Sequence, residues 1–287
     1  MIRWVNQRLK YQVNAVESNY THNAQVPTTI IVCIVSGWVL VAVDAEVRLQ
    51  VNMINLMLGD CLERMKEIPD GSVDMVLTDP PYGTTDCKWD SVIPLEPMWE
   101  QLKRIIKPNG AIVLFGSEPF SSYLRMSNIK QYKYDWVWDK KKGGNPLLSK
   151  VMPIKVTETI SVFHSGAYYP IMTPRDKPKS RGSNRGIISE TTGNAFVENK
   201  TYTEYYPKNL IEFSNANQKG KLHPTQKPVA LLEYLIKTYT LEGETVLDNC
   251  MGSGSTGVAC INTNRNFIGI EKDETYFKIA QDRIAAI

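Results

Sequence analysis

The sequence predicts an α/β fold, a doubly wound and mainly parallel sheet that carries one inserted polar region. From Met53 onward, short apolar runs alternate with amphipathic segments of helical length. Between about Gly166 and Leu222 this alternation stops, and Asn, Thr, Tyr, Lys, Arg and Gly dominate. Sheets built this way bind ligands at the carboxyl ends of their strands, so functional residues are expected there.

The apolar runs predict seven strands in the main domain. VDMVLT at 73–78 is the clearest, because it is apolar nearly throughout and ends in a polar stretch. Trp136 and Trp138 lie two positions apart, so they share one strand face and are expected in the core. The expected strands are 54–59, 73–78, 111–117, 134–139, 159–165, 244–249 and 267–271.

Five helices are expected between these strands. The segment at 227–243 has Pro228 near its start and Gly243 past its end, which is the usual placement of these residues. The segment at 95–110 is expected to stop at Pro108 and Gly110. The other three expected helices are 60–68, 254–263 and 274–284.

The N-terminal segment is treated separately. Its apolar stretch, TTIIVCIVSGWVLVAV at 28–43, is shorter than the roughly 20 residues that a membrane span needs, and no cleavage pattern follows it. The central SGW predicts a hairpin turn. Residues 1–52 are therefore expected to be an extension, either a non-native start or a poorly ordered segment, before a domain at 53–287.

Composition excludes several classes of protein. The 287 residues carry a net charge of +3 and are 43% hydrophobic, which allows a sizeable core. The five cysteines are widely spaced without a CxxC pair, which argues against a disulfide framework and a cysteine zinc site. We expect no metal, no membrane association and a reducing, cytoplasmic location.

A glycine loop predicts a nucleotide-type cofactor. Gly252, Gly254 and Gly257 spell GxGxxG between an expected strand and helix, and Glu271 ends the next strand. The glycines let the backbone approach a ligand, and the acid can accept hydrogen bonds from ribose hydroxyls. NAD and S-adenosylmethionine both fit this pattern, and a glycine turn without a ligand is the alternative.

The stretch TDPPYG at 78–83 favours methyl transfer to a nucleobase amine. Asp79 supplies a carboxylate acceptor, the Pro80 carbonyl a second one, and Pro81 stiffens the backbone between them and Tyr82. Two acceptors on the amine hydrogens would free the nitrogen lone pair, and the Tyr82 ring could stack on an extruded base. The alternative is a strand-terminating turn.

With these motifs, residues 53–287 resemble the amino-type DNA methyltransferases of the permuted beta class, in which DPPY precedes the variable region and the glycine loop. The resemblance implies a Rossmann-like sheet, S-adenosylmethionine as cofactor and a flipped base in duplex DNA. Family members with Asp at the first position of the tetrapeptide mostly methylate adenine, and those with Ser mostly methylate cytosine. Asp79 therefore favours adenine.

The resemblance also implies a set of cofactor contacts. Asp60 would meet the adenine, Thr225 and Lys227 of HPTQKP the methionine carboxylate, and Glu271 the ribose. Two residues depart from the family pattern, because Asn249 and Cys250 stand where Pro and Phe are usual. The implied cofactor-binding residues are Asp60, Asp79, Thr225, Lys227, Asp248, Gly252, Gly254, Ser255 and Glu271.

Clustered basic residues predict DNA contacts, with 166–222 as the target-recognition region. Lysine and arginine neutralise phosphates, whereas Asn184, Asn194 and the arginines could read base edges. A solvated loop is the alternative. The expected DNA-binding residues are Lys140, Lys141, Lys142, Arg175, Arg181 and Arg185. Glu158 and His164 are expected to have structural roles. Trp89 follows the tetrapeptide, and capping of the base pocket and no part in the pocket are equally weighted alternatives for it.

Together these patterns predict a site-specific DNA methyltransferase acting on the N6 amine of adenine. The alternatives are the same reaction on the N4 amine of cytosine, a DNA-binding protein with a vestigial methylase site and, more remotely, a nicotinamide-dependent oxidoreductase. Double-stranded DNA is the expected partner. A homodimer and a cognate restriction endonuclease are further partners that the resemblance leaves open.

Overall fold

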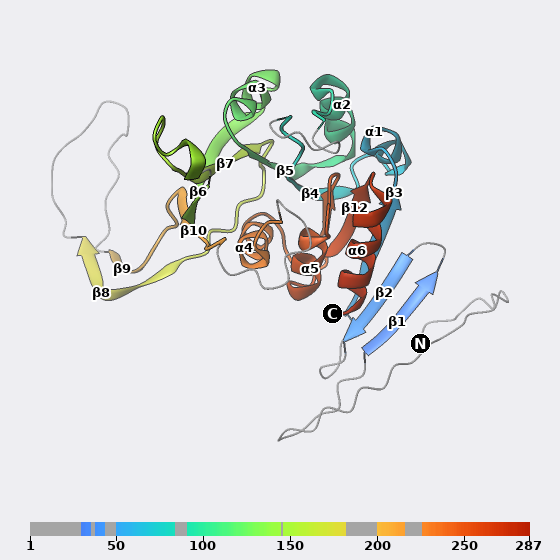
Figure 1. The fold of residues 1–287 in the computed structure, drawn as a ribbon. Coiled ribbons are helices and arrows are strands. Elements are labelled where there is room, and N and C mark those ends of the chain that lie inside the picture. The colour runs from blue at the N-terminus through green and yellow to red at the C-terminus, as the bar shows by residue number, and fades with distance from the viewer. Residues whose placement is uncertain are drawn as a thin grey trace, which may run out of the picture.

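The computed structural model describes residues 30–35, 38–43, 50–83, 91–144, 146–181, 200–215 and 226–287. Its centre is a ten-stranded sheet with strand order β1-β2-β3-β12-β11-β4-β5-β7-β6-β10 (Figure 1). The strands are β1 Ile30–Val35, β2 Trp38–Val43, β3 Gln50–Leu58, β4 Val73–Thr78, β5 Ile106–Gly116, β6 Tyr132–Gly144, β7 Lys155–Phe163, β10 Leu210–Glu212, β11 Thr245–Asp248 and β12 Asn266–Glu271. The helices are α1 Cys61–Arg64, α2 Leu95–Ile105, α3 Phe120–Ser127, α4 Val229–Tyr239, α5 Ser255–Asn262 and α6 Glu274–Ala285, with 3-10 turns η1 Met65–Glu67 and η2 Pro146–Leu148.

The central strands run parallel, as the sequence predicts. β3, β12, β11, β4 and β5 form consecutive parallel pairs. β7 is antiparallel to β5 and β6 is antiparallel to β7, while β2 and β1 are antiparallel at the other edge. The carboxyl ends of β3, β12, β11 and β4 therefore lie along one edge of the sheet.

Helices cover both faces of the sheet, which confirms the doubly wound class. All six residues of β4 are buried, and adjacent residues point to opposite faces. Leu77 belongs to the core with Leu235 of α4, and Val76 belongs to the core with Leu102 of α2. Figure 1 shows α4, α5 and α6 on one side of the sheet and α1, α2 and α3 on the other.

One predicted helix boundary is wrong. Helix α2 ends at Ile105, and residues 106–110, which were expected to complete it, begin β5. Ile106 pairs with Val73 and Ala111 pairs with Met75, so the four residues between them bulge from the ladder. Pro108 disfavours a helical backbone at the residue before it and cannot donate to a ladder, which suits it to this bulge.

The N-terminal apolar segment forms the hairpin that was expected. β1 and β2 pair antiparallel with Val35 opposite Trp38, and β2 then pairs with β3. Because β3 begins at Gln50, it runs across the boundary expected between residues 52 and 53, and the division into extension and domain stays a prediction. Within the described ranges, no helix is long and apolar enough to cross a membrane.

The polar region at 166–222 is partly described and contains two kinds of strand. β8 Thr173–Arg181 and β9 Lys200–Tyr205 form a separate two-stranded sheet. Figure 1 shows this sheet set apart from the main one, beyond β10. β10 pairs with β6 at the edge of the main sheet. Its expected role in target recognition remains a prediction.

Candidate active site and cofactor cavity

A cavity of about 830 Å³ lies at the carboxyl ends of β3, β4, β11 and β12. A volume of this order suits a cofactor or a drug-sized ligand. Most of the residues expected at the site line it, although they come from distant parts of the chain. The expected residues in its wall are Asp60, Asp79, Pro80, Pro81, Tyr82, Lys140, Lys227, Asp248, Gly252, Ser255 and Glu271.

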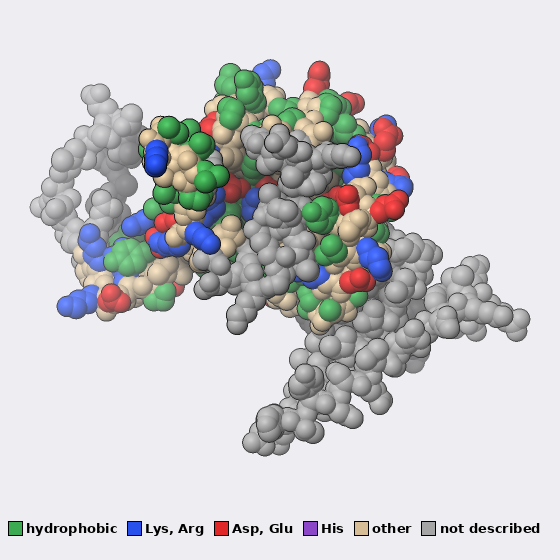
Figure 2. All heavy atoms as spheres, in the orientation of Figure 1, with side chains coloured by type: hydrophobic (Ala, Val, Ile, Leu, Met, Phe, Trp, Pro, Cys, Tyr) green, Lys and Arg blue, Asp and Glu red, His purple; other side chains and the backbone are tan. Residues whose placement is uncertain are grey.

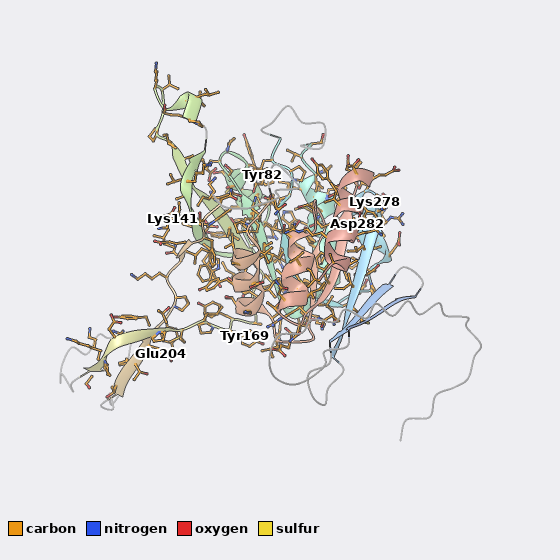
Figure 3. All side chains as sticks on the ribbon, turned by 60° about the horizontal axis from the view of Figure 1, so that its bottom comes forward. Tyr82, Lys141, Tyr169, Glu204, Lys278 and Asp282 are labelled. Carbon is orange, nitrogen blue, oxygen red and sulfur yellow. The ribbon has the colours of Figure 1, made fainter. Side chains whose placement is uncertain are left out.

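Asp79 and Tyr82 are joined directly at the end of β4. The Tyr82 hydroxyl donates to Oδ1 of Asp79 at 2.5 Å, and the ammonium of Lys227 donates to Oδ2 at 2.5 Å. Burial raises the pKa of Asp79, although Lys227 acts in the opposite direction. The Tyr82 ring stacks on Phe120, with ring centroids 5.1 Å apart. Figure 3 shows Tyr82 near the middle of the molecule, between Lys141 on one side and Asp282 on the other.

Glu158 is a second acid in this cluster, which sequence reasoning assigned to a structural role. Its Oε1 lies 3.0 Å from the Tyr82 hydroxyl and 3.0 Å from the Lys227 ammonium. Its Oε2 lies 3.6 Å from the ammonium of Lys140. Burial would raise the pKa of Glu158, but Lys227 and Lys140 outweigh it and hold the pKa below its usual range.

The cluster therefore balances two carboxylates against two ammonium groups. Burial alone would lower the pKa of Lys227, but Asp79 and Glu158 raise it instead. Lys227 was expected to face the methionine carboxylate of a cofactor, whereas here it bridges the two acids. A sequence signal for Glu158 exists, because it is in phase with the buried Ile160 and Val162 on one face of β7.

The glycine loop follows β11 and opens α5. Gly252 and Gly254 have φ of +51° and +76°, conformations that side chains rarely adopt. A Cβ atom on Gly254 would lie 2.9 Å from the Cβ of Ala280, so this residue also permits close packing of α6. Gly254 therefore shapes the loop from behind the cavity wall.

Glu271 organises this loop from the end of β12. Its Oε2 accepts the N–H of Gly252 at 2.8 Å, and its Oε1 accepts the N–H groups of Lys272 and Asp273, each at 2.8 Å. Burial raises its pKa, and these three donors act in the opposite direction. The carboxylate is thereby fixed at the cavity wall, where a ribose hydroxyl could reach it.

Asp248 connects the two strand ends that carry the motifs. Its Oδ1 accepts from the Thr78 hydroxyl at 2.7 Å and from the Cys250 N–H at 3.1 Å, and its Oδ2 accepts from the Thr256 hydroxyl at 2.6 Å. Burial raises the pKa of Asp248 to about 6. The end of β4 and the start of α5 are thus held to one buried carboxyl group.

Asp60 and Ser255 occupy two further corners of the cavity. Asp60 caps α1 by accepting the Leu62 N–H at 3.0 Å, and it receives the Lys272 ammonium at 3.1 Å. Ser255 begins α5, and its hydroxyl accepts from Arg283 of α6 at 2.8 Å. Thr225 lies outside the described residues.

Asn249 shows that the cavity wall suits a polar ligand. Its side chain is buried in the wall, and its amide meets the thiol of Cys61, a weak partner outside normal hydrogen-bond geometry, and no other described residue. Buried amides are normally paired, so a ligand with a donor and an acceptor fits this position. Cys250 beside it, which stands where the family has Phe, hydrogen-bonds through its thiol to Cys61.

The expected DNA-binding residues do not lie together in the structure. Lys140 faces Glu158 inside the cavity, and Lys141 pairs with Glu212 at 2.6 Å. Lys142 is exposed near the end of β6. Arg175 lies over the Tyr205 ring, 3.6 Å from its centroid, and holds β8 to β9. The Arg181 side chain, Arg185, Asn184, Asn194 and Trp89 lie outside the described residues.

A Rossmann-like sheet, a glycine loop and a carboxylate tetrapeptide at the adjacent strand end define a methyltransferase that acts on amino groups. Residues 73–282 match the model of a family described as DNA methylase, with N6 and N4 methyltransferases as its members. The chain belongs to this family.

Individual relatives agree with the family match. The type II methyltransferase M.HpaI of Haemophilus parainfluenzae is 28% identical over 80% of this chain and 73% of that relative. The crystal structure of the M1.HpyAVI–SAM complex is 28% identical, covers 81% of this chain and 99% of its own, and superposes with a TM-score of 0.56. The cytosine-N4-specific PvuII methyltransferase, at 19% identity, covers 81% of this chain and 86% of its own with a TM-score of 0.58, which shows the shared fold.

Proposed function

We propose that the chain transfers a methyl group from S-adenosylmethionine to the N6 amine of adenine in duplex DNA. When bound, the cofactor supplies an electrophilic methyl group. The observation that carries the proposal is the carboxylate of Asp79, which lines the cavity beside the glycine loop and accepts hydrogen bonds from two donors. An acid in this position of the tetrapeptide favours adenine over cytosine.

Asp79 and Pro80 have the task of activating a poor nucleophile. The lone pair of an aromatic amine is delocalised into its ring. Asp79 would accept one amine hydrogen and the Pro80 carbonyl the other, which favours a pyramidal nitrogen with a localised lone pair. After transfer the nitrogen carries an extra proton, and the pKa of Asp79, raised by burial, suits it to receive that proton.

Tyr82 and Glu158 would keep Oδ1 of Asp79 available to the amine. The Tyr82 hydroxyl has one hydrogen and lies 2.5 Å from Asp79 and 3.0 Å from Glu158. When an amine takes Oδ1 of Asp79, the hydroxyl can turn its hydrogen to Glu158 without losing a partner. The Tyr82 ring, which packs on Phe120, would stack on the adenine.

The remaining cavity residues would hold the cofactor. We assign Asp60 to the adenine end, Glu271 to the ribose, and Gly252, Gly254 and Ser255 to the loop that surrounds the methionine portion. Asp248 positions this loop, and Asn249 offers a weakly paired amide to the ligand. Lys227 is assigned to the acid pair, and Thr225 to the methionine carboxylate.

The wider setting follows from the same proposal. Lys142 and the β8–β9 region would contact phosphates and base edges of double-stranded DNA, as would Arg181 and Arg185. Such an enzyme works on cytoplasmic DNA. A second copy of the chain and a restriction endonuclease of the same sequence specificity are partners to test by size and by activity.

The test uses radiolabelled S-adenosylmethionine and duplex DNA from cells that lack DNA methylases, followed by mass spectrometry of the nucleosides. N6-methyladenine is expected. N4-methylcytosine without methyladenine would transfer the assignment to cytosine, and a gel shift without any methyl transfer would favour a vestigial site.

The Asp79→Ala variant should lower kcat at least about 100-fold, the range for loss of one catalytic group. Cofactor affinity, measured by calorimetry, should stay within about threefold of the wild type, because the described contacts of Asp79 are to Tyr82 and Lys227. Comparable turnover by this variant would contradict the role of Asp79.

A further inference from the structure

A projecting arm begins at the wall of the cavity. β6 and β7 pair with Trp138 opposite Glu158 and Gly144 opposite Lys155, and β6 bulges from the ladder between Asp139 and Gly144. Lys140 and Glu158 line the cavity, and residues 141–157 lead away from it. We call residues 141–157 the β6–β7 arm. Figure 3 shows it standing out from the body of the molecule, with Lys141 at its base.

The tip of the β6–β7 arm exposes large apolar side chains. Leu147 is 92% exposed, Val151 76% and Met152 52%. Ile154 and Val156, on the strand that returns to the cavity, are 47% and 42% exposed. Figure 2 shows hydrophobic side chains gathered on this part of the surface with a basic side chain among them. Exposed apolar side chains that gather in this way mark an interaction site.

Charge indicates what kind of partner fits the arm. Residues 141–157 contain four lysines and no acidic residue. Lys141 pairs with Glu212, whereas Lys142, before the apolar tip, and Lys150, within it, are exposed. A surface that combines apolar side chains with exposed cations and holds no acid complements duplex DNA, which has phosphates outside and stacked bases inside.

The position and reach of the arm fit the same partner. On the returning strand, six positions separate Glu158 at the cavity from Met152 at the tip, and extended backbone rises at most roughly 3.3 Å per position. The tip can therefore stand up to roughly 20 Å beyond the cavity, enough to pass the phosphates and enter a groove roughly 8 Å deep. A base entering the cavity would leave its stack within reach of the tip.

We propose that the β6–β7 arm is a wedge, whose tip inserts apolar side chains between base pairs next to the base that enters the cavity. Extruding a base costs a few kcal/mol, and apolar wedges lower that cost by unstacking and kinking the duplex. Leu147, Val151 and Met152 form the wedge, and Lys142 and Lys150 hold the phosphates beside it. The proposal rests on duplex DNA being the substrate of the proposed function.

The direct test is the linking number of an unmethylated plasmid that is relaxed by a topoisomerase in the presence of the full chain and S-adenosylhomocysteine. Insertion untwists the duplex, so the wild type should shift the linking number in proportion to the protein added. A single chain carrying Leu147→Ser, Val151→Ser and Met152→Ser should leave it unshifted and should methylate duplex DNA at least about tenfold more slowly. These three side chains are exposed, so the variant should fold normally.

Two controls separate the wedge from general effects. Leu241→Ser removes an apolar side chain of the same 52% exposure as Met152, from the loop at the amino end of the central strand β11, and should change neither readout by more than about twofold. Lys150→Gln should reduce the slope of log affinity against log salt by about 0.9, the effect of one phosphate contact, while the linking-number shift persists.

The outcomes distinguish failure of the wedge from failure of the proposed function. A wild type that methylates the plasmid and leaves its linking number unchanged overturns the wedge. A triple variant that changes oligomeric size and still shifts the linking number shows instead that the tip binds a second copy of the chain. A wild type that shifts the linking number without methylating any DNA supports the wedge and overturns the proposed function.

Discussion

Substituting Asp248 with Asn tests the energetic cost of the carboxylate that joins the two motifs. Asp248 is 4% exposed, and burial raises its pKa from 3.8 to about 6. An acid with a raised pKa binds its proton more tightly in the folded protein than in the unfolded chain. Its contribution to stability is therefore complete below about pH 4 and is lost as the pH rises through about 6.

The size of this effect follows from the shift. The interval between 3.8 and about 6, at roughly 1.4 kcal/mol per pH unit, corresponds to about 3 kcal/mol in the free energy of unfolding. About 2 kcal/mol of this should be lost between pH 4.5 and 7.5, because the group is already partly ionised in the unfolded chain at pH 4.5. Asn has no such dependence and resembles the protonated acid.

The assay is urea unfolding of the wild type and Asp248→Asn at several pH values between 4.5 and 7.5. The difference between the two proteins cancels most contributions of other acids. As the pH rises, the free energy of unfolding of the variant should gain about 2 kcal/mol relative to that of the wild type, because only the wild type has the ionising carboxyl group. The new amide keeps a partner, since the Thr256 hydroxyl can turn to accept from it. A difference that stays constant across this range would refute the assigned pKa.

Three further substitutions test other parts of the site. Glu158→Gln removes a negative charge that raises the pKa of Asp79, so that pKa should fall and the acidic limb of the kcat–pH profile should move to lower pH. An unmoved profile would contradict coupling of the two acids. Gly254→Ala places a side chain at φ of +76° and 2.9 Å from Ala280, so the free energy of unfolding should fall by about 1–3 kcal/mol in a urea titration. The control Gly243→Ala has φ of +81° but no atom within 4 Å of the new Cβ, so it should lower the free energy of unfolding by less. Asn249→Leu should weaken cofactor binding about tenfold in calorimetry, while the thermal midpoint stays level or rises because a poorly paired buried amide is removed. Unchanged affinity would show that the amide does not meet the ligand.

Strand and helix periodicity predicted the architecture because each element buries a regular face. The runs around Leu77 and Val113 are apolar nearly throughout, as expected for strands covered on both faces, and both lie in the core. The error at 106–110 arose where a periodic helix passes directly into a strand without an intervening loop. Pro108 marked the change of structure there, but it could not show on which side of it the helix ends.

Site residues could be predicted where they belong to one short motif. They were missed where they reach the site only through contacts between distant parts of the chain. Asp79 and Tyr82 are three residues apart and lie together in the cavity. Glu158 is 76 residues from Tyr82, and it reaches the site because β7 pairs with β5 in the antiparallel part of the sheet. Lys227 lines the cavity and meets both Asp79 and Glu158, and its contact with Glu158 depends on the same pairing.

Because β4 and β11 are neighbours in the sheet, the two motifs that follow them lie close together although they are far apart along the chain. The two strands pair through Met75 with Val246, and Thr78 bonds to Asp248 across 170 positions of chain. Of the strands between them in the chain, β8 and β9 form a sheet of their own. Evolution can consequently exchange or lengthen that two-stranded sheet without altering the separation between Asp79 and the glycine loop. Two fragments cut within it should reassemble into the same site.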